Sequence, residues 1–247
     1  LYPKQKTPTP VVLPAVTPTT PVVTSTPEAT STAAATSTFA FTGSFRNSQD
    51  TDADGLTDGE EQEIYHTDPN NLDTDRDTYL DGGEVFYLYN PNGFAPVTLN
   101  GSGVVHTIGG ETIGFTAYAP VDWPVQADTQ SLVVHSPGDE EKFHYDIRSN
   151  PGNLSLLEWV RLQDIQTDIS TLVPYTNRMG VAGYRTADNF TAYFPMQSAV
   201  LVVTYDPGAR RELQYRRTFD MTLQSVTILK HVVTSQDIVG MIPGATS

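Results

Sequence analysis

Alternating apolar and polar residues recur through the C-terminal part of the chain and predict a series of β-strands. Successive side chains of a strand point to opposite faces, so a half-buried strand alternates in this way. The predicted strands cover the segments 104–108, 113–119, 132–136, 142–148, 181–186, 190–194 and 199–205. Pro-Gly pairs that begin at Pro137, Pro151 and Pro207 mark turns between them. Strands that follow one another through short turns indicate a mainly antiparallel sheet.

Two further segments have the spacing of helices. Ser155 precedes Glu158 by three residues, which is the capping-box spacing at a helix start, and apolar residues continue to Leu162. A second helix is predicted near residues 218–226, where apolar residues recur at helical spacing. Residues 100–240 are therefore predicted to form an α+β domain, a mainly antiparallel sheet with helices packed on a face.

The first 38 residues have a different composition, rich in Pro, Thr, Ser, Ala and Val. Such a stretch buries too little apolar surface to offset its chain entropy, and its prolines favour extended conformers. We expect an extended stalk or arm. Two alternatives stay open: residues 11–13 and 22–23 could add to the sheet edge of another subunit, and the Thr and Ser residues could carry O-linked sugar.

The charge of the chain is concentrated in one segment. The formal net charge is -15, and residues 48–90 hold thirteen Asp and Glu against one basic residue, Arg76. The rest of the chain is close to balance, and no basic patch suggests a nucleic acid partner. The chain has no Cys, which excludes disulfides and thiolate metal sites. No apolar run reaches the length of about 18 residues that a membrane span needs. The sequence begins at Leu1 rather than Met, so we expect a processed chain or a fragment, with an export signal or anchor before it.

The acidic segment 39–95 contains a twelve-residue loop with the donor spacing of a calcium site. Calcium binds six to eight oxygens, and such a loop supplies them from positions 1, 3, 5, 7, 9 and 12, with a sharp turn at position 6. Gly55 occupies position 6. The predicted ligands are Asp50, Asp52, Asp54, the carbonyl of Leu56, Asp58 (directly or through water) and Glu61.

The same pattern returns 23 residues later. Its predicted ligands are Asp73, Asp75, Asp77, the carbonyl of Tyr79, Asp81 and Glu84. Thr78 replaces the glycine at position 6, and a β-branched residue there costs about 1–2 kcal/mol. We expect a weaker second site or a distorted turn.

Ten carboxylates at ligand spacing repel one another without a cation, which favours metal binding over a solvated acidic loop. So many carboxylates favour calcium over magnesium, and about two ions are expected. The connector 62–72 leaves room for about two helical turns, so the loops are not a sensor EF-hand pair. Short helices after each loop, ending at residues 64–65 and 85–89, should supply what small core this segment has.

Two family resemblances follow from these motifs. The string from Asp50 to Glu61, with His-Thr-Asp-Pro-Asn-Asn-Leu-Asp-Thr-Asp at 66–75, resembles the bacterial relatives of thrombospondin type 3 calcium repeats. That resemblance implies an exported, calcium-rigidified spacer on a cell surface. Asp68 matches a position in the connecting segment of those repeats, where we expect a turn and cap residue first and an extra ligand second. The C-terminal domain is similar to the PsbP-like α/β fold of bacterial exported proteins, which are mostly accessory or binding domains. The segments that carry this second resemblance are 114–120 with Trp123, 155–160, 180–184, 202–205 and 215–219.

Motifs typical of catalysis are missing from the sequence: no Gly-x-Ser-x-Gly elbow, His-Glu-x-x-His helix or phosphate loop occurs. Trp123 and Trp159 are interpreted as core aromatics, and residues 139–141 as a solvated hairpin tip. We therefore expect no enzyme. Two hypotheses stay open: a structural cell-surface protein that assembles with copies of itself or another surface protein, possible filaments included, or an adhesive head that binds carbohydrate or protein and is displayed on a calcium-stiffened stalk.

Overall fold

A seven-stranded antiparallel sheet is the largest element of the described part of the chain, which in this computed structural model comprises residues 45–164, 166–209 and 212–229. Its strands lie in the order β4-β5-β6-β10-β9-β8-β7. Their bounds are β4 Val125–Ala127, β5 Ser131–His135, β6 Lys142–Ser149, β7 Val173–Thr176, β8 Ala182–Arg185, β9 Thr191–Met196 and β10 Ala199–Asp206. The longest pairing joins β6 and β10 over their full length, from Ala199 opposite Ser149 to Asp206 opposite Lys142.

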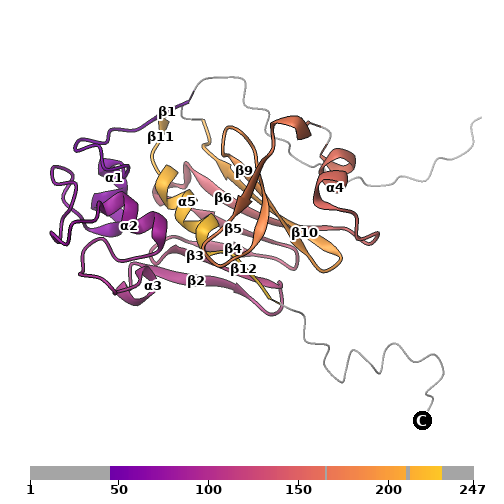
Figure 1. The fold of residues 1–247 in the computed structure, drawn as a ribbon, viewed down its shortest axis with the longest axis horizontal. Helices are drawn as coiled ribbons and strands as arrows, with labels where there is room; N and C mark the ends of the chain where they lie inside the picture. The colour runs from indigo at the N-terminus through magenta and orange to yellow at the C-terminus, as the bar shows by residue number, and fades with distance from the viewer. Residues whose placement is uncertain (1–44, 165, 210–211, 230–247) are drawn as a thin grey trace, which may run out of the picture. The chain divides into compact units, whose positions relative to one another are not determined.

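Two smaller sheets accompany it. One is antiparallel and has the order β12-β3-β2, with β2 at Val105–Gly110, β3 at Phe115–Pro120 and β12 at Thr227–Ile228. The other is a short parallel pair of β1, Arg46–Asn47, and β11, Glu212–Leu213. The parallel pair brings the segment before the first acidic loop beside the segment that leads into the last helix (Figure 1).

Helices follow the acidic loops and cover the sheets. The α-helices are α1 Asp58–Glu60, α2 Asp81–Tyr87, α3 Leu99–Ser102, α4 Leu156–Gln163 and α5 Arg216–Ser225. A π-helical turn, η1 Glu61–Tyr65, continues α1, and the 3-10 turns are η2 Pro137–Asp139 and η3 Ile169–Thr171. Helix α5 packs against both α2 and β3 (Figure 1). None of the helices in the described ranges combines the length and apolar composition that crossing a membrane requires.

Strand β10 separates two hydrophobic clusters. Leu201 and Val203 belong to the larger cluster, which includes Phe219 of α5, whereas Val200 and Val202 pack with Trp159 of α4. Alternate residues of a strand point to opposite faces, so a strand covered on both faces is apolar throughout. This explains why residues 199–203 of β10 are all apolar.

The segment with the acidic loops shares the larger cluster. Leu56, Ile64, Tyr65 and Val85 are all buried in it, together with residues of α5. The described residues, from 45 to 229, all belong to one compact unit. The domain boundary predicted between residues 95 and 100 stays a prediction. The small core expected for the loop segment is part of the larger hydrophobic cluster of the domain.

The predicted fold class is confirmed: the protein is α+β, with mostly antiparallel sheets and flanking helices. All the predicted strands and both predicted helices are present, with ends shifted by at most two residues. Trp123 and Trp159 are core residues, as predicted. Of the predicted solvated tip, residues 139–141, Glu140 is exposed, but the prediction is wrong for Glu141, which is buried and accepts hydrogen bonds from Tyr205 Oη and Gln214 N. The predicted arm, residues 1–38, lies outside the described residues.

Candidate metal centre

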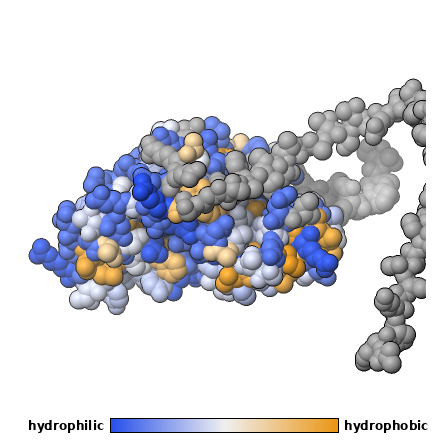
Figure 2. All heavy atoms as spheres, turned by 90° about the horizontal axis from the view of Figure 1, so that it is seen from above, coloured by the Kyte–Doolittle hydropathy of each residue, from blue (hydrophilic) through white to orange (hydrophobic). Residues whose placement is uncertain are grey.

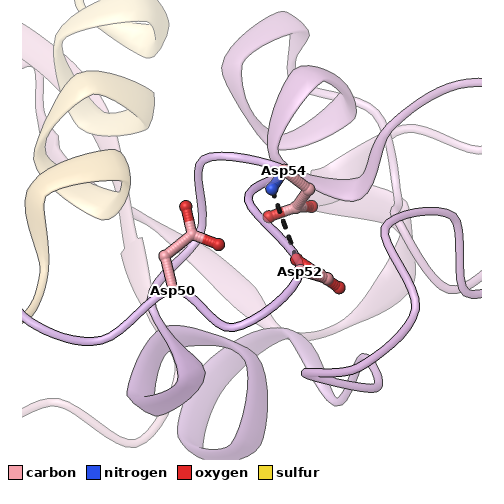
Figure 3. Close-up of side chains that lie close together, drawn as sticks. All are labelled: Asp50, Asp52 and Asp54. Atoms are coloured by element: carbon pink, nitrogen blue, oxygen red, sulfur yellow. Dashed lines mark hydrogen bonds between the residues drawn. The ribbon is translucent and has the colours of Figure 1, made fainter.

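The first acidic loop is organised by hydrogen bonds from its own backbone to its carboxylates. Asp50 accepts from Ala53 N through Oδ1 at 2.8 Å and from Gly55 N through Oδ2 at 3.1 Å. Asp52 Oδ1 accepts from Asp54 N at 3.3 Å, and Asp54 Oδ1 accepts from Leu56 N at 2.8 Å. The chain therefore wraps around the carboxylates. Figure 3 shows the Asp50 carboxylate pointing across the loop toward those of Asp52 and Asp54.

The second loop repeats these hydrogen bonds 23 residues later. Asp73 accepts from Arg76 N at 2.8 Å and from Thr78 N at 2.9 Å. Asp77 N donates to Asp75 Oδ1 at 3.0 Å, and Tyr79 N donates to Asp77 Oδ1 at 3.0 Å. The two loops therefore have one backbone design.

Backbone dihedrals confirm the shared design. Position 4 is left-handed in both loops, with φ of 63° at Ala53 and 64° at Arg76. Position 6 is also left-handed, with φ of 102° at Gly55 and 85° at Thr78. Non-glycine residues pay a steric cost in this region. Thr78 thus makes the same turn as Gly55, so the second loop keeps its geometry, and weaker binding there stays a prediction.

Position 9 closes each loop onto position 2. Asp58 accepts from Thr51 N and from Thr51 Oγ1, both at 2.8 Å. Asp81 Oδ1 accepts from Thr74 N at 2.9 Å. Asp58 has both oxygens engaged, which suits its predicted contact through water, whereas Asp81 has one oxygen left over.

Five carboxylate oxygens of the two loops are buried without a hydrogen-bond partner in the described part of the chain. They are Asp52 Oδ2, Glu61 Oε2, Asp75 Oδ2, Asp81 Oδ2 and Glu84 Oε2. Buried polar atoms are almost always paired, and an isolated buried carboxylate is costly. All five belong to residues predicted as ligands, and a bound cation is the partner that would satisfy these oxygens.

The spacing of the aspartates fits calcium as well. Oxygens of Asp50, Asp52 and Asp54 lie within 4.8 Å of one another, and so do oxygens of Asp73, Asp75 and Asp77. Ligand oxygens at about 2.3–2.6 Å from one calcium ion are at most about 5 Å apart. Each loop therefore gathers three carboxylates around a space of the right size.

Burial of the glutamates at position 12 strongly raises their pKa. It raises the pKa of Glu61 to about 8, with a further contribution from Asp52 and Asp54 of the same loop. It likewise raises the pKa of Glu84 to about 8, with help from Asp77 and Asp75. Glu61 Oε1 accepts from Thr67 Oγ1 at 3.0 Å, and its Oε2 is one of the unpaired buried oxygens. A divalent cation would favour the ionised form of both glutamates and displace the protons.

The remaining predicted ligands are backbone groups. The Leu56 side chain is buried in the core, whereas the Tyr79 side chain is 62% exposed. Their carbonyl contacts, and the complete set of twelve ligands, stay predictions. The connector makes a turn at Asp68, as predicted: Asp68 Oδ1 accepts from Asn70 N, and Asp68 O accepts from Asn71 N.

The two loops are in direct contact through Gly82. Gly82 N, in the first turn of α2, donates to Asp54 Oδ2 of the first loop at 2.6 Å. The sequence reasoning missed this residue, together with the threonines at position 2, Thr51 and Thr74. The threonine that recurs at position 2 of both loops was a signal that could have been used. Gly82 gave no such signal, because its partner lies 28 residues away.

Comparison with known proteins gives a match to a family model and a likeness to a solved structure. The family model of the bacterial TSP3 repeat matches residues 50–72, which include the first loop and the connector and end one residue before the second loop. Among solved structures, the chain is similar to the solution structure of cyanobacterial PsbP (CyanoP) from Synechocystis sp. PCC 6803. The TM-score is 0.35 and the identity 13%, over 51% of this chain and 93% of that chain. No curated protein matches this chain.

Proposed function

We propose that this chain is an exported, structural cell-surface protein that binds two calcium ions, one in each acidic loop. The proposal is carried by one observation: two loops with the same hydrogen bonds enclose buried carboxylate oxygens that have no partner among the described residues. The match of the first loop and connector to the bacterial TSP3 repeat supports calcium as the ion. When bound, calcium would supply charge neutralisation and coordination for these oxygens; the residues that would hold it are the carboxylates and carbonyls named above.

Calcium is favoured over magnesium by the donor set. Each loop presents five carboxylates, whereas magnesium keeps several waters and binds one or two carboxylates. Loops of this kind in extracellular modules bind calcium with Kd of about 10⁻⁴–10⁻³ M. TSP3 repeats are typically extracellular, which supports export of this chain.

The role that we propose for the ions is structural rather than catalytic. Glu61 and Glu84 are buried, and Leu56 and Tyr65 of the same segment pack in the main core. An ion held there would fix the loops and their exit helices against the domain. A free calcium concentration of about 100 times Kd would stabilise the native state by about 2.7 kcal/mol per site.

Calorimetric titration of the chelator-treated protein with calcium, and separately with magnesium, tests the proposal. Two calcium ions should bind, and magnesium should bind much more weakly. Glu61→Gln and Glu84→Gln should each remove about one ion, whereas Glu111→Gln, at an exposed position, should remove none. Absence of any heat at millimolar calcium would overturn the proposal.

The proposed structural role includes self-association on a cell surface, as in a filament or layer. The face seen in Figure 2 is mostly hydrophilic, with hydrophobic residues in small separate patches, so an assembly through this face would have to be largely polar. Sedimentation velocity with and without calcium decides this part of the proposal. Calcium-dependent oligomers would support it, and a monomer under both conditions would overturn it.

A further inference from the structure

Helix α5 is capped at its N-terminus by Glu60, which lies in the first loop. Its own N-cap residue, Tyr215, makes no side-chain cap hydrogen bond. Instead, Oε1 of the fully buried Glu60 accepts from Thr218 N at 2.7 Å and from Thr218 Oγ1 at 2.9 Å. A helix begins with backbone N–H groups that lack partners within the helix, and a carboxylate is a favoured acceptor for them.

The same carboxylate also caps helix α1. Glu60 Oε2 accepts from Thr57 N at 3.0 Å, and Thr57 Oγ1 accepts from Glu60 N at 3.2 Å, which together make a capping box. One side chain therefore joins the first turns of two helices that are 158 residues apart in the sequence.

Other hydrogen bonds hold these two segments together. Thr57 Oγ1 donates to Gln214 O at 2.7 Å, and Tyr65 Oη donates to Thr218 Oγ1 at 3.2 Å. Tyr215 Oη donates to Glu63 Oε2 at 2.6 Å. The turn α1–η1, which carries Glu60, is thus fixed to the first turn of α5 along its length.

Glu60 is also the residue next to Glu61, the predicted ligand at position 12 of the first loop. Glu61 N donates to Thr57 O, so both glutamates belong to one rigid helical turn. Glu61 Oε2 is one of the buried loop oxygens without a partner in the described part of the chain, and Glu60 caps α5. An ion that draws Glu61 toward the aspartates must therefore fix the position of Glu60 as well.

We propose that Glu60 is a positioning residue that transmits calcium occupancy of the first loop to helix α5. This inference rests on the proposed function, because it requires that the first loop binds calcium. Coupling of this kind is reciprocal: if calcium orders α5, then the contact between Glu60 and α5 raises the affinity of the first loop for calcium by the same factor.

The far end of α5 is also held by a residue from outside the helix. Asn177 Nδ2 donates to Leu223 O at 3.0 Å and to Val226 O at 2.7 Å. Asn177 lies between β7 and β8, at the edge of the large sheet. Order in α5 therefore reaches from the calcium loops to this edge of the domain.

Hydrogen exchange of the full chain, with calcium and after chelation, tests the inference. In the wild-type protein, the amides of residues 218–224 should exchange at least about tenfold faster after chelation. In Glu60→Ala, two ions should still bind, the first loop should lose at least about fivefold in affinity, and exchange in α5 should no longer depend on calcium. Glu60→Gln retains one acceptor oxygen and should recover part of the calcium dependence; should Glu60→Ala fail to fold, this variant carries the test.

Glu158→Ala is the matched control. Glu158 has the same role in the capping box of α4, with Ser155 in place of Thr57, and α4 packs against β9 and η3. Calcium should protect α5 in this variant as in the wild type. Two ions bound without any change of exchange in α5, or a normal response in Glu60→Ala, would overturn the inference alone. Absence of calcium binding in the wild-type protein would overturn the proposed function, and this inference with it.

Discussion

Gly82 and Gly83 are neighbours in the first turn of α2, and their replacement by alanine should have opposite effects. A Cβ added at Gly82 would lie 2.6 Å from Asp54 O and 3.1 Å from Leu56 N, both backbone atoms of the first loop. A Cβ added at Gly83 would meet Leu80 Cβ at 3.9 Å, which is an ordinary contact. The pair therefore separates the effect of loop contact from that of helix propensity.

The magnitudes follow from these distances. At Gly82 the new methyl group intrudes about 0.8 Å inside the shortest ordinary contact of 3.4 Å, and the loop backbone has to move. Overpacking of this kind costs about 1–3 kcal/mol, while alanine gains up to about 1 kcal/mol over glycine within a helix. We expect Gly83→Ala to stabilise the protein by about 0.5–1 kcal/mol and Gly82→Ala to destabilise it by up to about 2 kcal/mol. Gly82→Ala should also weaken calcium binding in the first loop, because it displaces Asp54, which accepts from Gly82 N.

Thermal unfolding and calcium titration of both variants measure these effects. For a chain of this size, 1 kcal/mol corresponds to about 2–4 °C in Tm. Gly82→Ala should melt below the wild type and Gly83→Ala above it, and affinity should change in the first loop of Gly82→Ala alone. If Gly82→Ala melted at or above Gly83→Ala and bound calcium normally, the contact between the first loop and α2 would be refuted.

Three further predictions concern the ions. Burial and neighbouring carboxylates raise the pKa of Glu61 and Glu84 from 4.5 to about 8, so without calcium the native state binds more protons than the unfolded state. The free energy of unfolding should then fall as the pH rises from about 4.5 to about 8, and saturating calcium should remove that loss. Urea unfolding with and without calcium measures this, and an equal dependence of the unfolding free energy on pH in both conditions would contradict it. Thr78→Gly should relieve about 1 kcal/mol of backbone strain and raise calcium affinity of the second loop about fivefold by calorimetry, and unchanged or weaker binding would argue against strain there. Chelation should open the connector 62–72 and the bond after Arg76 to protease, and identical digests with and without chelator would count against a structural role for the ions.

The parts of this structure that depend on local spacing are predictable from the sequence. The loop ligands follow from a twelve-residue pattern, and the longer strands follow from alternation that each strand carries by itself. The short strands β4 and β7 were missed because they are only three and four residues long, and most of their residues are exposed. Their pairing is decided by the strand beside them rather than by their own pattern.

Contacts between distant segments were not predictable. Glu141 follows two other acidic residues and a Pro-Gly turn, which is typical of a solvated tip. Its partners, Tyr205 Oη and Gln214 N, lie 64 and 73 residues further along the chain. Glu60 is a similar case, because its contact with Thr218 joins segments 158 residues apart. Burial of a carboxylate depends on acceptor and donor groups that only the tertiary fold brings together.

Within each loop, the aspartates and the glutamate depend on the ion to different degrees. Both oxygens of Asp50 accept backbone hydrogen bonds, and those of Asp73 do the same, so the turns are stabilised by the chain itself. Glu61 Oε2 and Glu84 Oε2 are buried, and neither has such a partner within residues 45–229 as far as the structure describes them. Removal of calcium should therefore release the helices that carry the two glutamates while leaving the aspartate turns largely formed. Because α1 and α2 pack on α5, the cost of losing the ions would fall on the domain rather than on the loops.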